Sequence, residues 1–108
     1  MADLELESRE SDEGASVVVR GEVDMATAPQ LRDTLLGLVD GGATHIALDC
    51  RGLDFLDSSG IGVLLWAHHR LEAAGGHLVV VNARGAVART LDITGASRIL
   101  DAGAPLLV

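Results

Sequence analysis

One short run of the sequence combines hydroxyl nucleophiles with carboxylate and glycine neighbours. It reads Asp57-Ser58-Ser59-Gly60-Ile61-Gly62. A serine in such a run can attack an acyl group when a base activates it, or it can accept a phosphoryl group from a kinase. A hydrolase nucleophile is expected inside Gly-x-Ser-x-Gly, and Leu56 stands where the first glycine of that motif belongs. The run therefore favours a phosphoacceptor, and a small hydrolase is the weakest hypothesis.

Ser58 is expected at the start of a helix that runs to Ala74. As the N-cap residue, it would accept a hydrogen bond from a backbone N–H and stabilise the helix by about 1 kcal/mol. A phosphate at the same place would be favoured by the positive end of the helix dipole and by free N–H groups. Gly60 and Gly62 keep the first turn free of bulk, so a partner or kinase can approach closely. Capping alone and phosphorylation both fit this position.

Acidic side chains are expected to gather around this serine. Ligands of open α/β sheets bind at the loops that leave the carboxyl ends of the parallel strands. Two such loops, residues 21–27 and 51–59, are rich in polar residues. Strands joined by a short crossover usually lie side by side. Glu22 and Asp24 should therefore come near Asp57.

The remaining reactive side chains favour structural roles. His68 and His69 are neighbours on a predicted helix and diverge, and His45 and His77 lie on different strands. We therefore expect no metal site and no cofactor. Cys50 is interpreted as a small packed residue rather than a redox sensor.

The elements that position these residues follow from hydrophobic periodicity and turn residues. The predicted elements are strands at 4–7 and 15–24, a helix at 27–40, a strand at 44–50 followed by a loop, a helix at 58–74, a strand at 77–81, a helix at 84–94 and a last strand at 98–101. The Thr27-Ala28-Pro29-Gln30 spacing predicts a capping box at the first helix. Gly41 and Gly42 are expected to end that helix.

This order predicts an α/β fold with a mixed sheet of four or five strands, parallel strand-helix-strand crossovers and about three helices. The 108 residues are too few for two independent cores, so we expect one domain over residues 1–108. Within it, residues 1–13 form an acidic N-terminal strand region with a net charge of −5.

Composition narrows the classes of partner. The formal net charge is −8 and aromatic residues make up only 2%. A phosphate backbone would be repelled, and ring platforms for single-stranded bases cannot be built, so no nucleic-acid partner is expected. No apolar run approaches the roughly 20 residues that span a bilayer. With one cysteine and no signal-peptide pattern, the sequence predicts a cytoplasmic protein without a membrane partner.

Four blocks of the sequence resemble the STAS domain of bacterial anti-sigma factor antagonists. They are Gly-Glu-Val-Asp at 21–24, Phe-Leu-Asp-Ser-Ser-Gly-Ile-Gly-Val-Leu at 55–64, Gly-Gly-His-Leu-Val-Val-Val at 75–81 and Val-Ala-Arg-Thr-Leu-Asp-Ile-Thr-Gly at 87–95. The similarity runs in order from about residue 4 to 101. Its most specific part is the Asp-Ser-Ser-Gly-hydrophobe-Gly core.

The resemblance implies a binding protein without catalytic activity of its own. In that family the dephosphorylated antagonist binds an anti-sigma factor, an ATP-dependent serine kinase, and frees a sigma factor for transcription. The kinase phosphorylates the serine after the motif's aspartate, which is Ser58 here, with Ser59 as second choice. A metal-dependent serine phosphatase resets it. The expected partner-binding residues are Glu22, Asp24, Asp57, Ser58, Ser59, Gly60 and Gly62.

The sequence departs from the family near its C-terminal end. Most members carry a final helix after the position of Leu100, but Gly103 and Pro105 interrupt this region. That helix is expected to be missing or short. A scaffold or accessory STAS protein, in a stressosome-like or transporter-associated complex, is the alternative function. A monomer or weak dimer is expected for the antagonist.

Overall fold

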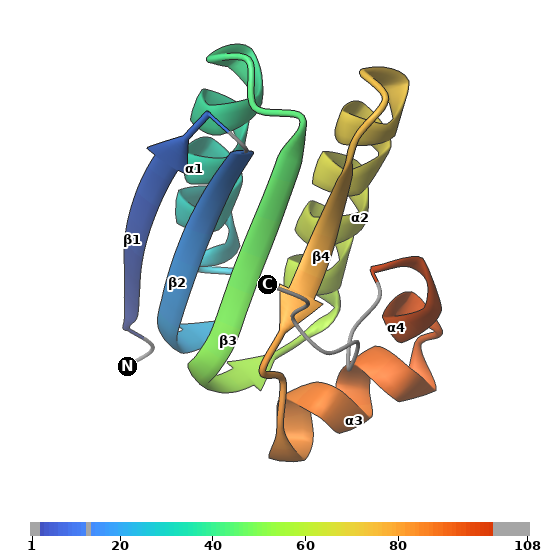
Figure 1. Cartoon of the computed structure of the whole chain (residues 1–108). Coiled ribbons are helices and arrows are strands. Elements are labelled where there is room, and N and C mark those ends of the chain that lie inside the picture. Colours follow the sequence, from blue (N-terminus) through green and yellow to red (C-terminus); the bar gives the residue numbers. More distant parts are fainter. Residues whose placement is uncertain (1–2, 13, 101–108) are drawn as a thin grey trace.

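The computed structural model describes residues 3–12 and 14–100, which form one mixed sheet with helices packed on it (Figure 1). The elements are β1 (Leu4–Ser11), β2 (Gly14–Val23), α1 (Ala28–Asp40), β3 (His45–Leu56), α2 (Ser58–Ala73), β4 (His77–Val81), α3 (Gly85–Ile93) and α4 (Ala96–Ile99). The strand order is β1-β2-β3-β4. β1 is antiparallel to β2, whereas β2, β3 and β4 run parallel. The α/β fold with a four-stranded mixed sheet is confirmed.

α1 and α2 lie side by side against one face of the sheet, α3 lies past the carboxyl ends of β3 and β4, and α4 packs against α3 and α2 (Figure 1). Alternate side chains of the strands point toward the helices and pack against their apolar faces, and together they form the core. The fully buried large side chains include Val17, Val19, Leu31, Leu35, Ile46, Leu48, Leu64, Leu71, Leu78 and Leu91. Burying one such side chain contributes about 1.5–3 kcal/mol to the stability of the fold. This core therefore fixes the ends of the strands and the loops that follow them.

β3 is longer than the sequence predicts. The predicted strand ended at residue 50 and gave way to a loop, but the observed strand continues to Leu56. Its pairing with β2 shifts twice, and each shift adds one residue on β3. Beyond Leu48 and Cys50 the buried positions therefore change from every second to every third residue, at Leu53 and Leu56. The prediction was wrong because such bulges interrupt the period of two on which it relied.

The capping box at the start of α1 is also wrong. Thr27 is the N-cap residue, but its side chain makes no capping bond. Its hydroxyl donates instead to the carbonyl of Glu22 at 2.9 Å. The Gln30 side-chain amide donates to the carbonyl of Leu4 at 3.2 Å. Both side chains find backbone acceptors in β1 and β2, which tie the helix start to the sheet. The predicted end of the helix before Gly41 is confirmed.

The region after α3 differs from the predicted last strand. Gly95, with a φ of 80°, begins a turn into α4, a helix of four residues that covers part of the predicted strand at 98–101. The carbonyl of Leu100 then accepts a hydrogen bond of 3.0 Å from the backbone N–H of Val80. The described residues therefore contain no fifth strand. Residue 101 and the expected missing or short final helix lie outside them.

Cys50 is packed inside the molecule, with 1% of its surface exposed. Burial raises the pKa of its thiol to about 12, and the neighbouring Asp49 carboxylate adds to this effect. Thiolate is the reactive form of cysteine, so the native thiol is shielded both sterically and electrostatically.

We therefore predict that Cys50 reacts very slowly with a disulfide reagent at about pH 8 in the native protein, and stoichiometrically once the chain is unfolded in denaturant. Absorbance of the released thiolate follows both reactions. Fast stoichiometric labelling of the native protein would contradict the buried placement of Cys50.

Candidate functional site

The carboxyl ends of β2 and β3 lie side by side (Figure 1). Val23, the last residue of β2, pairs with Leu56, the last residue of β3. The backbone N–H of Asp57 donates a hydrogen bond of 3.2 Å to the carbonyl of Val23. Asp24 and Asp57 are thus the next residues on two neighbouring strands. The two acidic loops meet at one edge of the sheet, as the topology predicts.

Asp24 is held by the loop that it starts. Its Oδ1 accepts hydrogen bonds from the backbone N–H groups of Ala26 at 2.9 Å and Thr27 at 3.0 Å. The Thr27 hydroxyl accepts from the backbone N–H of Asp24 at 3.0 Å while it donates to Glu22. Sequence reasoning did not predict that Thr27 holds this loop through its side-chain hydrogen bonds. The Asp-x-x-Thr spacing, typical of a turn closed by side-chain bonds, was the available signal.

Asp57, and not Ser58, is the N-cap residue of α2. Its backbone is extended, and its Oδ1 accepts from the N–H groups of Ser59 at 2.9 Å and Gly60 at 3.3 Å. Ser58 is the first helical residue and is exposed. Its hydroxyl forms no hydrogen bond with any residue of the described ranges 3–12 and 14–100. The predicted capping role of Ser58 is wrong because the strand stays extended through Asp57.

This division of roles predicts different effects of two alanine substitutions. Asp57→Ala should lower the free energy of unfolding by about 1 kcal/mol, because the first-turn N–H groups lose their acceptor. Ser58→Ala should change it by less than about 0.5 kcal/mol. Urea unfolding followed by the fluorescence of Trp66, the single tryptophan, measures both.

Asp57→Asn is the matched control, since asparagine caps a helix about as well as aspartate. It should unfold close to the unsubstituted chain. A larger loss for Ser58→Ala than for Asp57→Ala would contradict the assignment of the cap.

Gly60 and Gly62 occupy different surroundings in the first turn of α2. A Cβ on Gly60 would lie 2.3 Å from Cδ1 of Leu56 and 2.7 Å from Cγ1 of Val23, both buried side chains. Gly60 is therefore the contact at which α2 packs onto the ends of β2 and β3. A Cβ on Gly62 would meet nothing within 4 Å, and this residue is exposed. Only Gly62 leaves open surface beside Ser58.

Gly60→Ala should therefore lower the free energy of unfolding by about 1–3 kcal/mol, the usual cost of overpacking a core. Gly62→Ala should raise it by up to about 1 kcal/mol, because alanine favours a helix interior over glycine. Chemical denaturation compares the two. Equal effects of the two substitutions would show that Gly60 does not form this contact.

Two large apolar side chains are exposed at the same edge. Met25, in the loop after β2, is 79% exposed, and Phe55, near the end of β3, is 43% exposed. Phe55 pairs with Glu22, which is also exposed. Sequence reasoning missed both apolar residues: Met25 stands out in its loop, whereas Phe55 lies among Leu53 and Leu56 in β3 and gave no such signal. The edge thus offers carboxylates, hydroxyls and apolar surface together, a composition suited to binding another protein.

Within residues 3–12 and 14–100, no three His, Cys, Asp or Glu side chains cluster in a way that could hold a metal ion. In the same part of the chain, no helix has the length and apolar character to span a membrane.

Nearly the full chain matches a known domain: residues 5–106 match the family model of the STAS domain. The chain belongs to the STAS domain family. The anti-sigma-B factor antagonist of Bacillus subtilis is 29% identical to this STAS domain over 101 residues, which are 94% of this chain and 92% of the relative. The resemblance inferred from the four sequence blocks is confirmed.

Solved structures agree with this assignment. An anti-sigma factor antagonist from Mycobacterium paratuberculosis has a TM-score of 0.84 and 28% identity, over 96% of this chain and 88% of the other. The anti-sigma factor antagonist SpoIIAA in its unphosphorylated form has a TM-score of 0.78 and 26% identity, over 94% of this chain and 89% of the other. The names of these STAS proteins describe binding regulators, not enzymes.

Proposed function

We propose that this STAS domain is an anti-sigma factor antagonist that is controlled by phosphorylation of Ser58. The dephosphorylated form binds an anti-sigma factor that is also an ATP-dependent serine kinase, and a sigma factor is released. Phosphorylation ends this binding, and a metal-dependent serine phosphatase restores it. The observation that carries the proposal is the exposed hydroxyl of Ser58 beside Asp57, which alone caps α2.

The chemistry of the switch is a phosphoryl transfer. The Ser58 hydroxyl oxygen attacks the γ-phosphorus of ATP, and its bond to phosphorus forms as the bond between that phosphorus and the β-phosphate oxygen breaks. ADP leaves, and the hydroxyl proton passes to water. The product carries about −1.5 to −2 charges at pH 7. Its phosphate stands next to the Asp57 carboxylate and close to the loop of Asp24. Because α2 begins without help from the Ser58 hydroxyl, the modification leaves the helix cap in place.

The added charge weakens binding through desolvation and repulsion. A partner that covers this edge must remove water from the phosphate and from the two carboxylates. Every loss of about 1.4 kcal/mol reduces affinity tenfold, so one modification is sufficient for a switch. Met25 and Phe55 supply apolar contact area whose burial favours the unmodified complex.

The contact surface that we propose extends over the carboxyl edge of the sheet and the first turn of α2. It consists of Glu22, Asp24, Met25, Phe55, Asp57, Ser58, Ser59 and Gly62, whereas Gly60, which the sequence alone also suggested, is buried beneath it. Ser59 is the second choice of phosphoacceptor because it is less exposed than Ser58 and its N–H is bound to Asp57. We further propose that the protein acts in the cytoplasm as one domain over residues 1–108, as a monomer or weak dimer without nucleic acid.

Incubation with the anti-sigma factor kinase of the same organism and ATP should add one phosphate, and mass spectrometry should locate it on Ser58. Ser58→Ala should abolish the modification, whereas the matched control Ser59→Ala should retain it. Ser58→Asp should weaken binding to the kinase by at least about tenfold in calorimetric titration.

A phosphate on Ser59, or no phosphate at all, would contradict the proposed site. A large stable complex whose formation does not depend on Ser58 would instead support the scaffold or accessory function.

A further inference from the structure

His45 and His77 lie side by side at the end of the sheet opposite Ser58. They are the first residues of β3 and β4 and are direct partners in the parallel register of these strands. Their ring centroids are 5.0 Å apart, and the ring planes meet at 81°. Two imidazoles that are distant in sequence are therefore held together by the pairing of two parallel strands.

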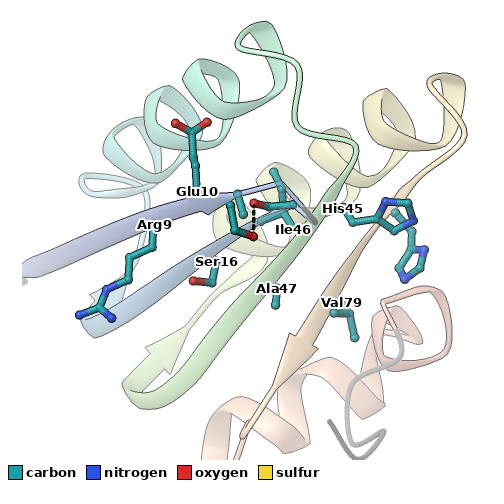
Figure 2. A pocket seen from close by; sticks show the side chains of 11 residues that line it. Arg9, Glu10, Ser16, His45, Ile46, Ala47 and Val79 are labelled. Carbon is teal, nitrogen blue, oxygen red and sulfur yellow. Dashed lines mark hydrogen bonds between the residues drawn. The ribbon is translucent and has the colours of Figure 1, made fainter. Parts of the chain in front are cut away.

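Both rings are open to solvent. His45 and His77 are exposed, and they alternate with Ile46 and Leu78, which are buried against the helices. They therefore point to the face of the sheet that α1 and α2 leave uncovered. Figure 2 shows His45 at the rim of a shallow hollow of this face, near Val79 and far from Arg9.

The backbone around the pair is tightly fixed. The N–H of His77 donates to the carbonyl of Thr44 at 3.0 Å. A Cβ on Gly76 would overlap that same carbonyl, so the two strands approach as closely as glycine allows. The Thr44 hydroxyl lies 3.1 Å from Nδ1 of His45. In the tautomer whose Nδ1–H donates to this hydroxyl, the lone pair of Nε2 is available to a ligand.

We propose that His45 and His77 together bind one divalent transition-metal ion of the zinc type. Imidazole nitrogens are ligands that suit Zn²⁺, Ni²⁺ and Cu²⁺, and a hydrogen bond from the second ring nitrogen commonly orients such a ligand. The χ2 torsion angle of histidine has a broad range of allowed values. A rotation about this angle is enough to direct one nitrogen of each ring at a shared ion.

Water completes the coordination of this ion. Glu10 lines the same hollow, but its carboxylate points toward α1, where Oε1 lies 3.8 Å from the position of a Cβ on Gly41 (Figure 2). The site is therefore a two-histidine clamp with solvent ligands. Because the ligands come from two strands, the ion binds the folded chain in preference to the unfolded chain and stabilises it. The clamp is remote from Ser58, so it acts independently of the proposed switch.

Titration of the untagged full chain with Zn²⁺ in a calorimeter should show saturable binding of one ion per chain. His45→Ala and His77→Ala should each weaken it by at least about tenfold, since even loss of an outer hydrogen bond to a ligand costs that much. His69→Ala is the matched control. His69 is an exposed histidine on α2 whose Nδ1 lies 3.5 Å from Glu72, and its loss should leave the affinity unchanged.

A second readout is the imidazole nitrogen resonances, which should shift for His45 and His77 on addition of Zn²⁺ and not for His69. Absence of saturable binding up to about 1 mM Zn²⁺, or binding that survives in the double variant His45→Ala/His77→Ala, would overturn the proposal.

Discussion

The parallel pairing of β2 with β3 is the constraint on which the candidate site depends. It brings Val23 opposite Leu56 and lets the N–H of Asp57 reach the carbonyl of Val23 at 3.2 Å. The loop that contains Asp24 and the start of α2 are thereby fixed next to each other. The buried side chains between sheet and helices hold this pairing, so the core determines the position of the exposed serine.

At this edge the residues that hold the structure differ from the proposed phosphoacceptor. Asp57 satisfies two N–H groups of the first turn, and Thr27 braces the loop of Asp24. Gly60 lets the helix pack onto the strand ends, where any side chain would collide with Leu56. Ser58 takes part in none of these contacts. A residue with this freedom can gain a charged group while its neighbours preserve the fold.

The fold could be predicted from the sequence because its main signals are local. The apolar stripe of α1, the glycines that end it and the apolar run of β4 are all visible in the sequence. The predictions that failed concern the end of β3 and the N-cap of α2. They depend on strand pairing and on which side chain accepts the hydrogen bonds of the first helical turn. The bulges of β3 appear only in its register with β2. That Asp57 stays extended beyond them and caps α2 is likewise visible only in the structure. By residue type alone, Asp57 and Ser58 are nearly equal capping residues.

The positions of the site residues followed from topology, but their contacts did not. The convergence of Glu22, Asp24 and Asp57 needed only the rule that crossover strands are neighbours. The exposure of Met25 depended on how the loop after β2 turns, and the exposure of Phe55 depended on the register of β3 with β2. The pairing of His45 with His77 depended on the register of β3 and β4, so separate strands were wrongly taken to keep the two histidines apart.

We infer that Ser58 serves the switch and not the fold. The measurement that tests this compares the chain carrying phosphoserine at position 58 with the unmodified chain, in unfolding free energy and in affinity for the anti-sigma factor. We expect unfolding free energies within about 1 kcal/mol of each other and an affinity reduced at least about tenfold. Unchanged affinity, or a modified chain that loses several kcal/mol of stability, would contradict it.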